Sequence, residues 1–83
     1  MTRAEILREA ENLINGDRAS DYGDAKKNFN DIAGLWSVFL EQPINRQQVA
    51  ICMVLVKAAR LMKSNKDDHW VDICGYTALG GEE

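Results

Sequence analysis

Residues 45–62 read NRQQVAICMVLVKAARLM, and this stretch decides the fold. Its apolar run at 49–56 is consistent on its own with a buried strand. However, Asn45 followed by Gln48 is typical of a helix N-cap, and further apolar residues extend the pattern to Met62. A pattern of about 18 residues is too long for a strand and predicts a helix. Because this helix is apolar almost all round, we expect it to be the central element, packed on more than one side.

Two helices are predicted before this central one. The first covers 3–15, begins with a Thr2–Glu5 capping box and is closed by a left-handed stop at Asn15-Gly16. The second covers 25–41, begins at the N-cap Asp24 and repeats apolar residues at intervals of three and four. These apolar residues form its predicted packing face: Phe29, Ile32, Ala33, Trp36, Phe39 and Leu40.

A shorter helix is predicted after the central one. It begins at Asp67 or Asp68, either of which can cap it, and ends near Leu79, where Gly80-Gly81 closes it. Its predicted packing face consists of Trp70, Val71, Ile73, Cys74, Thr77 and Ala78. The side chains expected on the opposite side are those of Asp68, His69, Asp72 and Tyr76.

These four helices and a length of 83 residues predict a single all-α domain over residues 1–83. The expected architecture is a compact bundle of three long helices plus a shorter C-terminal helix. A domain of this size buries only about 60 to 65% of the surface of its unfolded chain. We therefore expect the chain to cover further apolar surface by assembling into a homo-oligomer.

The charge balance and the cysteines limit the partners and the compartment. Ten Lys and Arg against thirteen Asp and Glu give a net charge of -3 and a pI near 5.1, which argues against general nucleic-acid binding. No apolar run approaches the roughly 20 residues of a membrane span, and the amino terminus lacks the apolar segment of a secretory signal. Cys52 and Cys74 lie in apolar stretches without a CxxC motif, so two buried free thiols are expected rather than a disulfide. We therefore expect the chain in the cytoplasm, without a membrane partner.

A set of cations and tyrosines forms the predicted ligand site. Lys57 and Arg60 lie three residues apart on the central helix, where they continue a stripe that begins as apolar. Together with Arg18, they are predicted to bind phosphate. Tyr22 or Tyr76 is expected to contact a base or sugar. Guanidinium, ammonium and aromatic groups in combination favour a nucleotide-like ligand.

Two carboxylates form the predicted metal site. Asp68 and Asp72 stand four residues apart and so share one side of their helix. Mg²⁺ binds one or two such carboxylates together with substrate phosphates, so we expect these residues to be its ligands. The structural alternative is a salt-bridge network in which Asp72 neutralises Lys57 or Arg60 across antiparallel helices. His69, the single histidine of the chain, is expected to be exposed near its helix start.

Several short motifs are distributed along the chain: Arg18, Tyr22-Gly23-Asp24, Asn28-Phe29, Ile32-Ala33, Leu35-Trp36, Lys57-Ala58-Ala59-Arg60 and the run from Asp68 to Tyr76. On these motifs the chain resembles, over residues 6–81, a small phage and prophage protein family with no established activity. Its Tyr-Gly, Lys-x-x-Arg and Asp-x-x-Gly-Tyr elements also resemble those of predicted nucleotide-modification-associated phage domains. More distantly, they are similar to the all-helical MazG-type nucleoside triphosphate pyrophosphohydrolases.

The MazG resemblance implies Mg²⁺-dependent cleavage of a nucleoside triphosphate between its α and β phosphates, with acidic residues of two helices holding the metal. This chain departs from that pattern, because residues 49–62 include no carboxylate and Asp68 and Asp72 are spaced differently. What carries over from the resemblance is a helical nucleotide pocket.

Two functions of different classes follow from the sequence. The leading hypothesis is a phage-encoded accessory protein that binds a nucleotide or a nucleotide-derived small molecule, with activity as a degenerate Mg²⁺-dependent pyrophosphohydrolase left open. The alternative is a non-enzymatic phage adaptor or inhibitor that acts on a host protein through a helical surface.

Overall fold

The computed structural model describes residues 1–16 and 24–83, and the regular structure in these ranges is entirely helical. The helices are α1 (Arg3–Asn15), α3 (Ala25–Leu40), α4 (Arg46–Lys63) and α5 (Asp67–Gly81). The predicted all-α class is therefore confirmed. The predicted order of lengths does not hold, because α5 has 15 residues and α1 has 13. The C-terminal helix is longer than expected since Gly80 and Gly81 remain helical.

Side-chain caps fix the starts of three helices where the sequence predicts them. The Thr2 hydroxyl accepts from the amide of Glu5, and the Glu5 carboxylate accepts from the amide of Thr2 at 2.9 Å. Asn45 and Gln48 form the same reciprocal pair at the start of α4. Asp24 accepts from the amide of Lys26 at the start of α3. The hydrogen bond from the Thr2 amide holds the pKa of Glu5 below its ordinary value.

Two predicted helix ends are wrong in detail. Gly16 is extended, with φ -90° and ψ -158°, and does not form the expected left-handed stop. A glycine is nevertheless required there, because a Cβ atom would lie 2.3 Å from the carbonyl oxygen of Asn12. The N-cap of α5 is Lys66, without a side-chain cap, while Asp67 and Asp68 lie in the first turn. There, their negative charges still interact favourably with the helix dipole.

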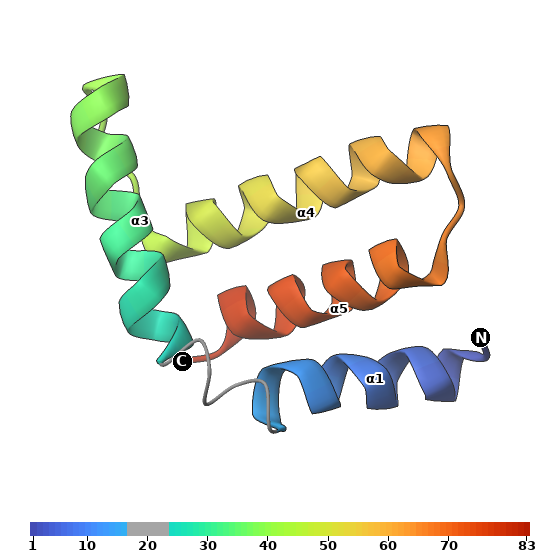
Figure 1. Ribbon diagram of the computed structural model, residues 1–83. Coiled ribbons are helices and arrows are strands. Elements are labelled where there is room, and N and C mark those ends of the chain that lie inside the picture. Colours follow the sequence, from blue (N-terminus) through green and yellow to red (C-terminus); the bar gives the residue numbers. More distant parts are fainter. Residues whose placement is uncertain (17–23) are drawn as a thin grey trace.

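Three helices lie side by side, and the fourth, α3, crosses the ends of two of them, α4 and α5 (Figure 1). The helix α5 packs between α1 and α4, and runs antiparallel to α4. The helix α3 packs against the beginning of α4, and its C-terminal end extends past the row formed by the other helices. The predicted central helix thus has two packed sides, as expected, and so does α5.

The core lies where α3 meets α4 and α5. Its buried residues are Phe29 and Ala33 of α3 with Val49 and Ala50 of α4. Packed against them are partly buried Ile32, Trp36, Ile44, Tyr76 and Leu79. Trp36 therefore contributes to the core, as its predicted place on the packing face of α3 requires.

The connection between α3 and α4 is tied back onto α3. The Ser37 hydroxyl donates to the carbonyl of Ala33 at 2.7 Å and accepts from the amide of Ile44 at 2.9 Å. At the start of α4, the Arg46 guanidinium donates to the carbonyl of Glu82, the residue after α5, at 3.0 Å. The Ser37 bonds hold the connecting segment against α3, and the Arg46 bond ties the start of α4 to the end of α5.

The molecule is less compact than the predicted bundle. Its radius of gyration is 13.5 Å, whereas a globular chain of this length has about 12 Å. Its accessible surface is 6140 Å², whereas a monomer of this mass exposes roughly 5000 Å². The exposed end of α3, which extends past the other helices, contributes to this excess.

Neither cysteine is bonded to the other. Both Cys52 and Cys74 are free, as predicted. Cys74 is half-buried but Cys52 is exposed on α4, so the prediction of two buried thiols is wrong for Cys52. No helix of the described part of the chain is long and apolar enough to cross a membrane.

Candidate functional site

The predicted ligand residues that the structure describes all lie in the second half of the chain. Arg18 and Tyr22 lie outside the described residues. Lys57 and Arg60 lie in the C-terminal half of α4, and Asp68, Asp72 and Tyr76 lie on α5. The antiparallel pairing of α4 and α5 brings Lys57 and Asp72 into contact.

Lys57 forms an ion pair with Asp72. The Lys57 Nζ atom lies 3.1 Å from Oδ2 of Asp72, and the two side chains are 20% and 31% exposed. This confirms the structural alternative for Lys57 and Asp72 that the sequence leaves open. The pair joins the two most extensively packed helices, and each charge compensates the other where water is partly excluded.

Arg60 lies one turn further along α4 and remains exposed. It forms no ion pair with any residue in the ranges that the structure describes. Of the predicted phosphate-binding cations that are described, Arg60 is thus the one whose charge is available to an anion. The predicted phosphate set would require Lys57 to share or release Asp72.

Tyr76 faces the protein interior. Its ring centroid lies 6.4 Å from that of Phe29, and the side chain packs against the core. The predicted division of α5 into one packed and one outward side is therefore wrong. The reason is that α5 has neighbours on two sides, so that Val71 and Gly75 are buried while Tyr76 and Asp72 are half-buried.

The two predicted metal ligands differ in their surroundings. Asp68 is exposed in the first turn of α5, and Asp72 is engaged with Lys57. Neighbouring Asp67 accepts from the N-terminal ammonium at 3.3 Å. Among residues 1–16 and 24–83, no group of three or more acidic, His or Cys side chains is positioned to hold a metal ion. The Mg²⁺ assignment to Asp68 and Asp72 stays a prediction.

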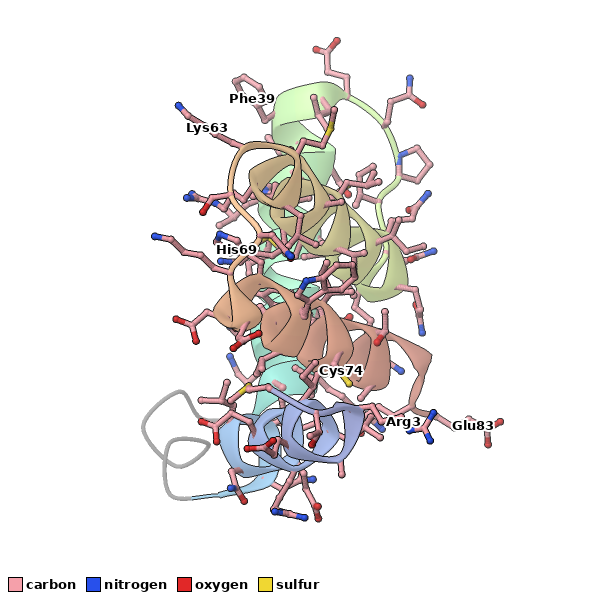
Figure 2. The ribbon with its side chains drawn as sticks, turned by 90° about the vertical axis from the view of Figure 1, so that its right-hand side faces the viewer. Arg3, Phe39, Lys63, His69, Cys74 and Glu83 are labelled. Carbon is pink, nitrogen blue, oxygen red and sulfur yellow. The ribbon has the colours of Figure 1, made fainter. Side chains whose placement is uncertain are left out.

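His69 is less exposed than predicted. Its side chain is half-buried near the start of α5 (Figure 2), and its Nδ1 atom is buried without a hydrogen-bond partner. The sequence places His69 on the outer side of α5 because a single helical period has one buried face. The packing of α4 against this turn removes that exposure.

The most prominent surface feature is apolar, and the sequence does not locate it. Leu35, Val38 and Phe39 form an exposed stripe on the last turns of α3, which we call the α3 stripe. Phe39 is 85% exposed although its periodicity predicts packing, because α3 extends past the helices that would cover it. Figure 2 shows the Phe39 ring pointing outward, on the side of α3 away from the connection to α4.

A second apolar stripe lies on α4. It consists of Ile51, Leu55 and Met62, which we call the α4 stripe, and Met62 is 91% exposed. The all-round apolar character of residues 49–62 is the sequence signal for it, since only part of that helix can be buried by α3 and α5. The sequence does not indicate on which sides of α4 the helices α3 and α5 pack, and therefore not which apolar residues of α4 stay exposed.

Comparisons with known proteins bear on the family of the chain. A family model described as a domain of unknown function, DUF6378, matches residues 5–83. The "Gene 55 protein" of Mycobacterium phage L5 is 45% identical over 76 residues, which cover 89% of this chain and 49% of that protein. The "Gene 55 protein" of Mycobacterium phage D29 is 43% identical over 72 residues, which cover 86% of this chain and 48% of that protein.

These matches confirm the predicted resemblance to a phage protein family without a known function. The chain spans about half the length of the curated relatives that it matches. No solved structure matches it. The resemblances to nucleotide-modification domains and to MazG-type enzymes stay predictions.

Proposed function

This chain belongs to the DUF6378 family, whose function is unknown, and within that family we propose that it is a non-enzymatic protein-binding domain. Its binding surface consists of the α3 stripe and the α4 stripe. The proposed partner is a protein chain that presents an uncharged, apolar helical surface. The proposal shares with the adaptor hypothesis of the sequence the binding of a protein through a helical surface, but it does not require that the partner is a host protein.

One observation carries the proposal, which is the exposure of large apolar side chains on two helices. Every member of the α3 and α4 stripes is more than half exposed. Among residues 1–16 and 24–83, the larger side chains that are fully buried are those of Val49 and Val71. Single exposed apolar residues are normal, but contiguous apolar surface on a small domain is typical of protein-binding sites.

The chemistry of the stripes suits a helix better than a charged ligand. Residues 35, 38 and 39 repeat at intervals of three and four, and residues 51, 55 and 62 are separated by four and seven positions, which also places them on one side of a helix. Such spacing is typical of the contact face in helix–helix packing. Because the stripes contain no charge, a polar partner would lose water contacts there without gaining hydrogen bonds.

A phosphate-binding role is the second candidate, and it is favoured by Arg60, which is exposed and forms no ion pair within the described part of the chain. A nucleotide whose free concentration is 100 times its dissociation constant stabilises the protein that it binds by about 2.7 kcal/mol. We expect no such stabilisation in thermal unfolding with nucleotides, with and without Mg²⁺. Stabilisation that disappears in a Lys57→Ala, Arg60→Ala double variant would support the phosphate site instead.

Site-specific photo-crosslinking in cells that produce this protein tests the protein-binding proposal. A benzophenone amino acid is placed at position 39 of the α3 stripe or at position 55 of the α4 stripe. We expect both positions to give crosslinked products of one defined mass. The peptide of the partner that carries the crosslink should come from a helix with an apolar surface. The matched control is position 7, because Leu7 of α1 is 60% exposed, as against 61% for Leu55.

The pattern over the three positions decides the outcome. Adducts with one and the same chain from positions 39 and 55, and none from position 7, support the proposal. Absence of any protein adduct at positions 39 and 55 would overturn it. Equal labelling at position 7 would also overturn it, because the stripes would then be no more than ordinary exposed apolar surface.

A further inference from the structure

We infer that the partner of the two stripes is a second copy of this chain, and that the α3 stripe of each copy packs on the α4 stripe of the other. This inference rests on the proposed protein-binding function and names the partner. Such an arrangement is a closed dimer with two-fold symmetry, in which both copies use the same residues.

The surface area of the chain supports a dimer of this kind. The accessible surface of 6140 Å² exceeds the roughly 5000 Å² expected for a monomer of this mass by about 1100 Å². A specific interface of standard size buries about 800 Å² on each partner. The excess is therefore sufficient for one such interface, and removing it from water would give the chain the exposed area of an ordinary small protein.

The two stripes cannot cover each other within one molecule. The core contact between Phe29 and Val49 fixes where α3 crosses α4, and the Ser37 hydroxyl ties the connecting segment back to α3. The end of α3 therefore projects from the row of helices instead of folding down along α4 (Figure 1). A second copy can supply to each stripe the helix that its own chain cannot.

The stripes differ in length and side-chain type, and neither carries a charge that would oppose their contact. The α3 stripe is short and carries the ring of Phe39 at its end, whereas the α4 stripe is longer and is formed by flexible or aliphatic side chains. Neither stripe contains a charge, so two copies that each carry a net charge of -3 can join there without burying like charges. Beside the α3 stripe, Lys27 and Asp31 already neutralise each other at 2.9 Å.

Analytical ultracentrifugation of the full chain tests the inference. We expect a species of twice the 9.3 kDa chain mass at micromolar concentration. Because both stripes take part in both halves of the interface, Phe39→Glu and Leu55→Glu should each give the mass of one chain. The control Leu7→Glu places the same charge at a site of equal exposure on α1 and should leave the dimer intact.

A milder pair of variants protects the test from misfolding. Phe39→Ala and Leu55→Ala keep the helices, as circular dichroism can verify, and each should raise the dissociation constant of the dimer at least about 30-fold, as expected for a central interface residue. A dimer that persists unchanged in Leu55→Ala and Leu55→Glu overturns the reciprocal arrangement.

The mass of the wild-type chain separates this inference from the proposed function. A single-chain mass at all concentrations overturns the second copy as the partner. In that case, crosslinks from positions 39 and 55 to a different protein would leave the protein-binding function standing. Absence of both the dimer and the crosslinks would overturn the two proposals together.

Discussion

At the scale of single residues, Glu5 couples the first helix to pH. Its carboxylate accepts a hydrogen bond from the amide of Thr2 at 2.9 Å, and this bond, together with the neighbouring Thr2 hydroxyl, holds the pKa of Glu5 below its ordinary value of 4.5. The ionised Glu5 carboxylate thus stabilises the folded chain fully at pH values above the ordinary pKa. This stabilisation is lost as the pH falls through the lower pKa that Glu5 has in the folded chain. NMR titration of the Glu5 carboxyl should give a midpoint below 4.5.

The variant Glu5→Gln provides the control for this titration. Its amide oxygen still accepts from the Thr2 amide but does not ionise. The acid-induced fall in thermal midpoint should therefore be smaller in Glu5→Gln than in the wild type. An identical fall in both chains would contradict a role for the Glu5 carboxylate in the cap.

The ion pair between Lys57 and Asp72 is expected to contribute measurably to stability. Asp72→Asn would leave the Lys57 ammonium, only 20% exposed, without its counter-charge. The expected loss in the free energy of unfolding is about 1 to 2 kcal/mol, between the values for exposed and fully buried pairs. Urea unfolding of Asp72→Asn, of Lys57→Met and of the variant with both substitutions measures the coupling energy between the two side chains.

The exposed pair of Lys27 and Asp31 is the matched comparison. Its side chains are 74% and 61% exposed, and the neighbouring carboxylate raises the pKa of Lys27. Asp31→Asn should change stability too little to measure, because water and salt screen the pair. Equal losses in Asp31→Asn and Asp72→Asn would mean that burial adds nothing to the pair on α4 and α5.

At the same scale, the candidate site was only partly predictable from the sequence. That Asp72 pairs with a cation of the preceding helix follows from the order of charges along two antiparallel helices, but the choice of Lys57 over Arg60 comes from the structure. The inward position of Tyr76 does not follow from the sequence, because periodicity reports one preferred face and α5 has two buried sides. Which side of a helix faces a ligand depends on where its neighbours lie.

At the scale of elements, Gly80 sets the distance between α4 and α5. A Cβ atom at this position would lie 2.6 Å from Cβ of Ala50, which is fully packed in the core. Gly80→Ala gains up to about 1 kcal/mol of helix propensity but costs about 1 to 3 kcal/mol of overpacking. We expect a net loss of stability in urea unfolding.

Gly81 is the adjacent control for this substitution. A Cβ atom there would meet nothing within 4 Å, so Gly81→Ala should be neutral or stabilising by up to about 1 kcal/mol. Stabilisation of the same size by Gly80→Ala would mean that α4 and α5 can move apart without loss. Destabilisation only at position 80 would locate the contact between the helices.

The elements differ in how far the sequence predicts them. The starts of α1, α3 and α4 depend on hydrogen bonds within three residues, and they were predicted to the residue. The end of α1 was predicted at the correct residue but with the wrong backbone conformation. The exposure of Phe39 was missed, because its periodicity matches that of buried Phe29 and only the crossing of α3 over the other helices separates them.

At the scale of the whole molecule, folding and association should be coupled. The buried hydrophobic residues are few and small, since Ala10, Ala33 and Ala50 make up half of them. A core of this size leaves an isolated chain only marginally stable. Burial of the α3 and α4 stripes by a second copy would then supply much of the stability of the folded state.

Thermodynamic linkage turns this coupling into a measurable dependence on concentration. If the dimer unfolds to two separate chains, each tenfold rise in concentration favours the folded dimer by about 1.4 kcal/mol. The midpoint of urea unfolding should therefore increase between about 1 and 100 μM for the wild type and for Leu7→Glu. It should be lower and independent of concentration for Phe39→Glu, because a chain that unfolds without dissociating has no mass-action term. A wild-type midpoint that does not change with concentration would mean that the small core is sufficient on its own, and that the exposed stripes contribute nothing to folding.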